Sequence, residues 1–203
     1  MLDPEFRELS VAFSSFLVII SMAYYVVQTL RGAIKPHSFS WFVWVVVTMI
    51  VVAGLKIEGE SLVFWRAVLM AACCLTVFLA SLRNGSYYIT RTDWLMLFAS
   101  LATIPVWRAT DDVTLAAIWL LAVEIAGALP SLTKAYRYPF EESLLAVLVN
   151  ATSTVFVLLA LDPALLSAWV YFGGWWIVQL IFICVLATRR LAVGGNLWKQ
   201  SWP

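Results

Sequence analysis

The feature that most constrains this chain is a succession of seven helix-length apolar stretches that carry almost no charge. Six of them reach 17 residues or more, which at about 1.5 Å per residue is long enough to cross the hydrocarbon of a bilayer. The fourth is shorter and has Pro105 near its end. The stretches are Val11–Leu30, Phe39–Leu55, Leu62–Leu82, Trp94–Trp107, Val113–Thr133, Ser143–Leu161 and Ala164–Thr188. We therefore predict an all-α integral membrane protein.

Composition excludes several other classes of protein. Charged residues make up 12% of the chain, whereas a soluble domain carries about 25%. The formal net charge of +1 gives no support to nucleic-acid binding. The sequence has no Ser-His-Asp set, no Cys-x-x-Cys pair and no phosphate-binding loop. We therefore predict no enzymatic activity, no catalytic residues, no metal site and no cofactor.

The distribution of lysine and arginine predicts the orientation of the chain. If all seven stretches cross, nine basic residues lie on one side and four on the other; if the fourth does not cross, the split falls to eight against five. The sharper asymmetry favours seven spans, with the N-terminus outside and the C-terminus in the cytoplasm, in a plasma membrane or a bacterial inner membrane. The four on the outer side are Arg7, Lys56, Arg66 and Arg108.

Two loop sequences resemble each other when one is shifted by 103 positions. Each has a basic residue, a proline five residues later and a serine four residues after that. The basic residue ends a helix, the proline forces a turn and the serine caps the next helix. The two copies are Arg31, Pro36 and Ser40, and Lys134, Pro139 and Ser143.

Each copy joins the first two helices of a three-helix unit, and the odd fourth helix restores the orientation between the units. We therefore predict seven transmembrane helices as two parallel three-helix repeats joined by one linker helix. The expected divisions are an interfacial N-terminal segment at 1–10, a first repeat at 11–82, a linker with the fourth helix at 83–112, a second repeat at 113–190 and a cytoplasmic tail at 191–203.

The segment Leu129–Arg137, with the sequence LPSLTKAYR, resembles the PQ-loop motif of the SWEET, SemiSWEET and lysosomal PQ-loop transporters. In that motif a Pro-Gln pair near the end of a repeat's first helix precedes a basic cytoplasmic loop. The second copy keeps Pro130 but has Ser131 in place of Gln, whereas the first keeps Gln28 but has Val27 in place of Pro. The resemblance implies a carrier of a small polar solute, sugar-like or vitamin-like, in which the proline acts as a hinge.

Three prolines are predicted hinge residues on this basis: Pro130 of the motif, with Pro36 and Pro139 at the two turns. The resemblance also implies that the carrier works by alternating access, one three-helix unit rocking against the other.

Glu124 is predicted to be the only acidic or basic residue well inside a span, twelve residues into Val113–Thr133. A carboxylate near the middle of the bilayer costs about 3 kcal/mol on insertion scales, so it needs a partner, water or a proton. We expect its side chain to point into the bundle, within reach of Asn150, Gln179 or a water molecule. A structural hydrogen bond between helices is the alternative interpretation.

The remaining predicted substrate-binding residues are polar or aromatic side chains inside other spans. Asparagine carries two donors and one acceptor, which are too many to leave in lipid. Tryptophans inside the spans form a stacking wall for a flat or ring-shaped ligand, or else pack between helices. The full predicted set is Glu124, Asn150, Trp44, Trp175, Gln179 and Thr48.

Two functions stay open at this point. The first is a carrier whose partners are a small solute and membrane lipid. The second is a non-transporting accessory or structural subunit of a larger membrane complex, which contacts lipid or pigment through its aromatic side chains. A homo-oligomer is also left open. A common central cavity for Glu124, Asn150 and Gln179 favours transport, whereas their contact with a neighbouring chain favours the accessory role.

The predicted topology leads to a labelling experiment. A cysteine that replaces Asp162 lies outside, and one that replaces Arg137 lies in the cytoplasm, because the basic residues set the orientation. A membrane-impermeant thiol reagent added to intact cells should modify the first and spare the second. The reverse pattern of labelling would contradict both the orientation and the seven spans.

Overall fold

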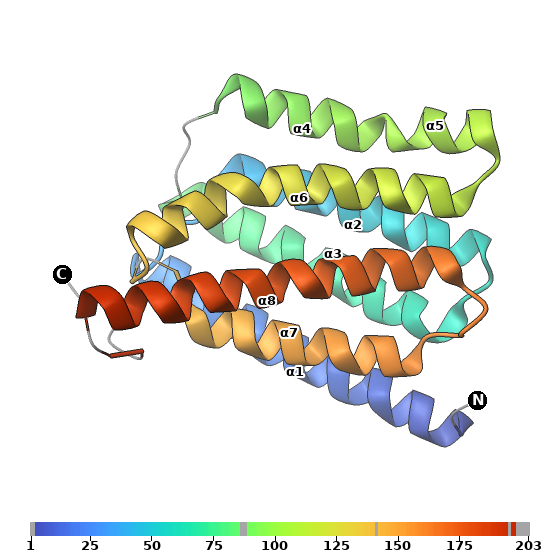
Figure 1. The fold of residues 1–203 in the computed structure, drawn as a ribbon, viewed down its shortest axis with the longest axis horizontal. Coiled ribbons are helices and arrows are strands. Elements are labelled where there is room, and N and C mark those ends of the chain that lie inside the picture. The colour runs from blue at the N-terminus through green and yellow to red at the C-terminus, as the bar shows by residue number, and fades with distance from the viewer. Residues whose placement is uncertain (1–2, 86–88, 141, 195, 198–203) are drawn as a thin grey trace.

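The computed structural model describes residues 3–85, 89–140, 142–194 and 196–197, and these residues form helices and connecting turns without a β-strand (Figure 1). The helices are α1 (Pro4–Leu30), α2 (Ser38–Ile57), α3 (Ser61–Asn84), α4 (Arg91–Leu101), α5 (Thr103–Thr110), α6 (Val113–Arg137), α7 (Leu144–Ala160) and α8 (Leu166–Gly194). The all-α prediction is therefore confirmed.

Five of the described helices, α1, α2, α3, α6 and α8, are long and apolar enough to cross a membrane. This observation supports an integral membrane protein. The helix α7 is apolar but has 17 residues, which at about 1.5 Å per residue is close to the minimum for a span.

The fourth predicted stretch is helical and forms one rod that is broken into α4 and α5 at Ala102. Pro105 explains the break, because its nitrogen has no hydrogen to donate to the carbonyl group of Leu101 and its ring clashes with that carbonyl. The rod carries a capping box at its start, where the Thr90 and Asp93 side chains each accept a hydrogen bond from the other residue's backbone.

The helical rods alternate in direction, and the two ends of the described chain lie at opposite ends of the bundle (Figure 1). The N-terminal end of the bundle holds the start of α1 and the turns between α2 and α3 and between α7 and α8. The C-terminal end holds the loops between α1 and α2 and between α6 and α7, as well as the end of α8. Both loops with the shared base-Pro-Ser pattern therefore lie at the C-terminal end.

The two loops begin their second helices differently. Ser143 caps α7 as predicted, because its hydroxyl oxygen accepts a hydrogen bond from the Ala146 backbone at 3.2 Å. The expectation that Ser40 caps α2 is wrong: the N-cap residue is His37, and Ser40 already lies in the first turn. A histidine ring nitrogen accepts the hydrogen bond from the Ser40 backbone at 3.4 Å, which lets α2 start earlier.

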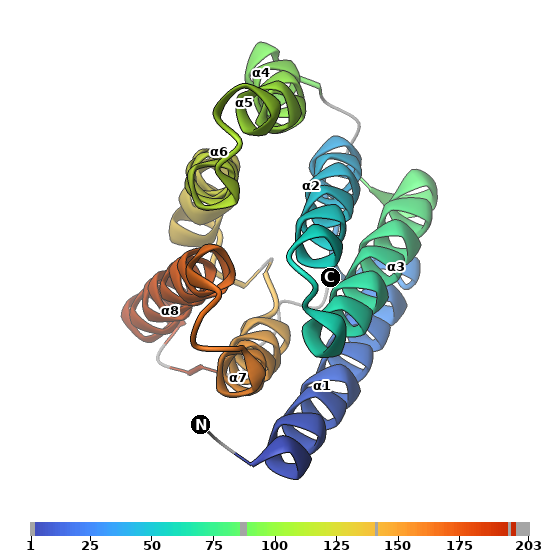
Figure 2. The same ribbon diagram turned by 90° about the vertical axis from the view of Figure 1, so that its right-hand side faces the viewer.

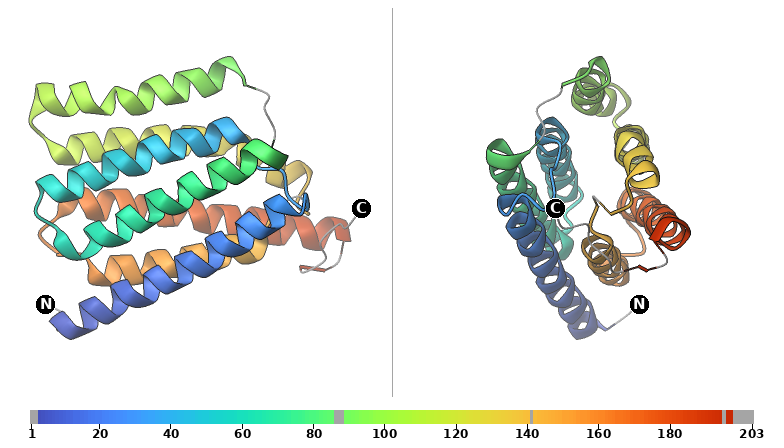
Figure 3. Two further views of the ribbon diagram at one scale, coloured as in Figure 1. Left: turned by 180° about the vertical axis from the view of Figure 1, so that it is seen from behind. Right: turned by 90° about the vertical axis from the view of Figure 1, so that its left-hand side faces the viewer.

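The helices form two halves, with α1, α2 and α3 in one and α6, α7 and α8 in the other (Figure 2). Figure 3 shows α3 between α1 and α2. In the other half α8 packs against both α6 and α7. The halves meet directly where α1 lies along α7, while α4 packs against both α2 and α6 on the opposite side of the bundle.

The hydrophobic core is shared between the halves mainly toward the N-terminal end. There Leu55 and Val63 of the first half belong to one cluster with Val157, Leu161 and Phe172 of the second half. Between membrane helices, the van der Waals contacts of such a packed cluster favour association, so it holds the halves together at this end.

Toward the C-terminal end each half has a core of its own. Val18, Trp41 and Val77 cluster within the first half, whereas Leu144 and Leu186 cluster within the second. The hydrophobic core is therefore shared between the halves at one end and separate in each half at the other, while α1 and α7 remain in contact.

The N-terminal end also has a polar contact that we expect to stabilise the fold. Glu60 accepts hydrogen bonds from the backbone of Leu62 and Val63 at 3.0 and 3.3 Å and forms a 3.6 Å ion pair with Arg7. Glu60→Ala should lower the free energy of unfolding by about 1 kcal/mol, as the loss of a helix cap does, and should lower the melting temperature.

The exposed Glu8 provides the matched control, since Glu8→Ala removes an acidic side chain from the same end of the bundle. Thermal unfolding in detergent compares the two variants. Equal melting temperatures for both variants would show that the Glu60 cap contributes nothing.

Candidate functional site

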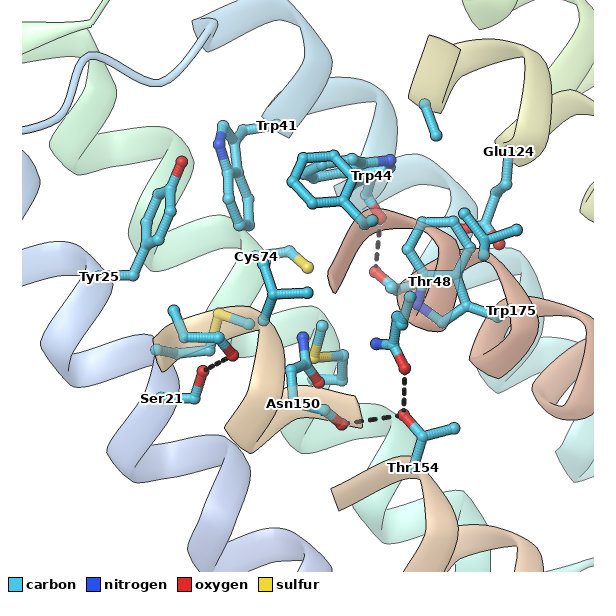
Figure 4. A pocket seen from close by; sticks show the side chains of 18 of the residues that line it. Ser21, Tyr25, Trp41, Trp44, Thr48, Cys74, Glu124, Asn150, Thr154 and Trp175 are labelled. Carbon is cyan, nitrogen blue, oxygen red and sulfur yellow. Dashed lines mark hydrogen bonds between the residues drawn. The ribbon is translucent and has the colours of Figure 1, made fainter. Parts of the chain in front are cut away.

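A cavity of about 400 Å³ lies between the two halves of the bundle and is lined by residues of α1, α2, α3, α6, α7 and α8. Ligand-binding cavities commonly have volumes of about 300 to 1,000 Å³. All six predicted substrate-binding residues line this one cavity, and Figure 4 labels five of them. The six are Glu124, Asn150, Trp44, Trp175, Gln179 and Thr48.

The cavity reaches the C-terminal end of the bundle, where Lys35, Pro36 and Glu142 of the two loops line it. In the opposite direction it stops at Val157 and Tyr171, which belong to the shared hydrophobic core. Loop residues thus line one end of the cavity, and packed side chains from both halves close the other.

Glu124 points into the cavity, as predicted, with only 6% of its surface exposed (Figure 4). Its partner differs from the prediction, because the Tyr171 hydroxyl donates a hydrogen bond to the Glu124 carboxyl group. The other carboxyl oxygen, Oε2, is buried and has no hydrogen-bond partner among the described residues. A buried oxygen without a partner is costly, so this atom marks a place where a ligand or water donates a hydrogen bond.

The Gln179 side chain is held by Thr154, which the sequence did not single out and whose hydroxyl also lies near the main-chain carbonyl of Asn150 in the preceding turn. The Thr154 hydroxyl lies 3.0 Å from both the Asn150 carbonyl oxygen and Gln179 Oε1 (Figure 4). This contact connects α7 to α8 beside the cavity and fixes the direction of the Gln179 side chain, which is 5% exposed.

Thr48 lines the cavity, but its hydroxyl hydrogen bonds to its own helix. Its Oγ1 lies 2.8 Å from the Trp44 carbonyl oxygen and 3.1 Å from that of Val45. Threonines in membrane helices often donate to the preceding turn in this way. The Thr48 hydroxyl can therefore accept a hydrogen bond from a ligand but has no hydrogen left to donate to it.

Aromatic side chains form one wall of the cavity. The rings of Trp41 and Trp44 meet edge to face with centroids 4.8 Å apart, and Tyr25 lies 5.2 Å from Trp41 (Figure 4). Trp41, near the start of α2, is 6% exposed and lines the cavity.

Arg66 is the functional candidate that the sequence analysis missed. It was assigned to the outer loops, but it is 5% exposed and lines the cavity. Its Nε donates to Ser14 Oγ at 3.1 Å and its Nη2 donates to Ser153 Oγ at 3.0 Å. Glu124, predicted to be the only acidic or basic residue well inside a span, therefore shares the cavity with a second buried ionisable side chain that lies near a span end. The signal was present, because Arg66 lies within the apolar stretch Leu62–Leu82 itself.

The predicted hinge prolines lie at different places. Pro36 lines the cavity in the loop between α1 and α2. Pro139 lies in the loop between α6 and α7, where its carbonyl oxygen accepts a hydrogen bond from Arg190 Nε at 2.9 Å. Pro130 falls within α6, but its side chain lies outside the described part of the chain.

A second cavity, of about 500 Å³, lies between α2, α5, α6 and α8 and is lined almost entirely by apolar side chains. Two polar atoms of α5 that border it, Thr103 Oγ1 and Trp107 Nε1, are buried without a hydrogen-bond partner among the described residues. The Ala99 carbonyl oxygen, to which a threonine at position 103 would ordinarily donate, accepts a hydrogen bond from Trp119 Nε1 at 2.9 Å instead.

Within the described ranges, no group of three or more His, Cys, Asp or Glu side chains is placed to hold a metal ion. Comparisons of the chain with family models, with curated proteins and with solved structures find no match. What the central cavity does must therefore be inferred from its own geometry and chemistry.

The contacts of Arg66 lead to a prediction about stability. Ser153→Ala should leave Arg66 Nη2 without its acceptor, and an unsatisfied buried donor costs about 1 to 3 kcal/mol. The control is Thr152→Ala, because the Thr152 hydroxyl is exposed and donates only to its own helix, to the Leu148 carbonyl oxygen at 2.9 Å. Thermal unfolding in detergent should separate the variants; a Ser153→Ala protein as stable as Thr152→Ala would refute this account of Arg66.

Proposed function

We propose that the chain is a polytopic membrane carrier for a small polar solute, sugar-like or vitamin-like, that works by alternating access. The observation that carries this proposal is the convergence of six polar and aromatic residues from four helices on one cavity between the halves. Glu124 Oε2 adds to it, because this buried oxygen offers a solute a hydrogen-bond acceptor that no described residue uses. Polar groups that specify orientation within an apolar wall are typical of small-molecule sites.

The arrangement of the helices supports two parallel three-helix repeats. In each half the helix that comes third in sequence packs against both of the others: α3 against α1 and α2, and α8 against α6 and α7. Both halves also begin at the N-terminal end of the bundle, since α1 and α6 run in the same direction (Figure 1). The rod of α4 and α5 returns the chain to the N-terminal end before α6 begins, so the two halves start in the same direction. Repeats related by an axis along the membrane normal have this shared orientation.

The unequal ends of the bundle support alternating access. At the N-terminal end a shared core closes the cavity, while at the C-terminal end each half packs on itself and loop residues line the opening. With the N-terminus outside, as the basic residues predict, this conformation opens toward the cytoplasm. Rocking the halves apart at the shared core would open the cavity to the outside, and PQ-loop-like prolines at Pro36, Pro130 and Pro139 remain the proposed hinges.

One observation favours the second candidate, a non-transporting subunit that holds lipid or pigment. The apolar cavity beside α5 offers the Trp107 indole N–H to an acceptor on an apolar molecule. Solute uptake by the purified chain distinguishes the two candidates. A carrier takes up solute alone, whereas an accessory subunit supports no uptake without its complex.

Uptake into proteoliposomes tests the carrier proposal. Radiolabelled neutral sugars, nucleosides and small hydroxy acids are offered to the purified chain, and saturable uptake above that of empty liposomes is expected for one of these classes. Trp44→Ala and Glu124→Gln should each lower the uptake by about tenfold or more, the effect of losing roughly 1.4 kcal/mol of binding.

Trp65→Ala is the matched control, because Trp65 is 70% exposed on the outer surface of α3 and lies outside the cavity. Its uptake should equal that of the wild type. Absence of saturable uptake by a folded wild-type protein would favour the accessory role, and uptake that Trp44→Ala and Glu124→Gln leave unchanged would remove the cavity from the pathway.

A further inference from the structure

Arg66 carries a buried positive charge, and its hydrogen bonds with described residues go to neutral groups. The guanidinium of arginine stays protonated in proteins. The ion pair of Arg7 with Glu60, which the described residues form at the N-terminal end, does not include Arg66. Its two hydrogen bonds go to the hydroxyl oxygens of Ser14 and Ser153. A buried cation is ordinarily paired with an anion, so this site lacks a charge of the opposite sign.

The two serines hold their oxygens toward Arg66 because their hydrogens are used elsewhere. The Ser153 hydroxyl donates to the Ser14 carbonyl oxygen at 2.9 Å, and the two hydroxyl oxygens lie 2.9 Å apart. With Ser153 donating to the carbonyl, Ser14 is left as the donor between the two hydroxyls. This chain of hydrogen bonds runs along the contact of α1 with α7 and holds the guanidinium in place at the wall of the cavity.

The guanidinium has donors left for a ligand. Arginine has five N–H groups in a planar fork, and the two serines accept two of them. Because Arg66 lines the cavity, the remaining donors are available to a molecule bound there. Such a fork fits the paired oxygens of a carboxylate or a phosphate, and it binds them more strongly than it binds neutral oxygens.

Glu124 places a second requirement on the same ligand. Its unpartnered Oε2 accepts a hydrogen bond, and Trp44 and Trp175 line the cavity together with it. A ligand that satisfies all of these groups has an anionic end, a flat or apolar body and a hydrogen-bond donor elsewhere.

We infer that the solute of this cavity is a small organic acid, whose carboxylate or phosphate binds Arg66 and whose hydroxyl or amino group donates to Glu124. This inference rests on the proposed function and narrows its substrate class. Arg66 then has two roles: in the empty cavity it ties α3 to α1 and α7, and with solute bound it neutralises the charge of the solute within the membrane.

The test compares acids with their uncharged counterparts in the full chain reconstituted in nanodiscs. The probes are 4-hydroxybenzoate and 4-hydroxybenzamide, lactate and lactamide, and 4-hydroxyphenyl phosphate, with glucose as a neutral polar reference. Quenching of tryptophan fluorescence reports binding, since Trp44 and Trp175 line the cavity. At least one acid should bind about tenfold or more tightly than its amide, and the comparison of carboxylate with phosphate identifies the anionic group.

Two substitutions assign the preference to Arg66. Arg66→Gln should abolish the difference between acid and amide, because it removes both the positive charge and the guanidinium fork. Arg66→Lys keeps the charge without the planar fork and should bind the acid about tenfold more weakly than the wild type does. If Arg66→Gln does not fold, the Arg66→Lys result alone decides.

The outcomes separate this inference from the proposed function. Equal binding of acids and amides, or an acid preference that Arg66→Gln retains, would overturn the organic-acid inference. Glucose binding that depends on Trp44 and Glu124 would at the same time leave the carrier proposal standing. If no probe binds to the folded wild-type chain and no solute is taken up into proteoliposomes, both are overturned.

Discussion

The structure depends on the fact that hydrocarbon offers no hydrogen-bond partner to a polar group. Every polar side chain at membrane depth must therefore find its partner inside the bundle. In this chain the requirement brings Ser14, Arg66 and Ser153 together across the contact of α1 with α7. It also turns Glu124 toward Tyr171 and toward the cavity. The same constraint that specifies how the helices rotate thus concentrates the polar chemistry at the centre of the molecule.

The two halves contact each other differently on the two sides of the bundle. Along α1 and α7 the halves touch directly and share hydrogen bonds, including one from the Ser21 hydroxyl to the Ala146 carbonyl oxygen at 3.0 Å. On the opposite side the direct contact between α2 and α6 is small, and α4 packs against both of them. A bundle joined firmly along one side and bridged along the other has an axis about which two rigid halves could rock, and this is the physical basis of the carrier proposal.

Much of the architecture could be predicted because it follows from length and hydropathy. The helical rods, the break associated with Pro105 and the capping role of Ser143 all come from local chemistry that a sequence displays directly. The convergence of Glu124, Asn150 and Gln179 on one cavity was predictable for the reason given above, since polar groups that avoid lipid must point to the interior.

The partners of these residues could not be predicted in the same way. Hydropathy gives the depth of a residue along its helix but not the rotation of that helix against its neighbours. Tyr171 and Thr154 therefore could not be recognised as the partners of Glu124 and Gln179. Arg66 was misplaced because an arginine near a span end ordinarily extends to the interface, whereas here two serines from other helices hold it inside.

The most direct test of the account is whether the central cavity opens to both sides of the membrane. A cysteine replaces Asn150 in a chain whose own cysteines, Cys73, Cys74 and Cys184, have been substituted, and a membrane-impermeant thiol reagent is applied to right-side-out and inside-out vesicles. A cysteine in place of Val18, which is fully buried in the core of the first half, gives the background. Alternating access predicts labelling at position 150 from both sides; labelling from one side only, or from neither, would contradict it.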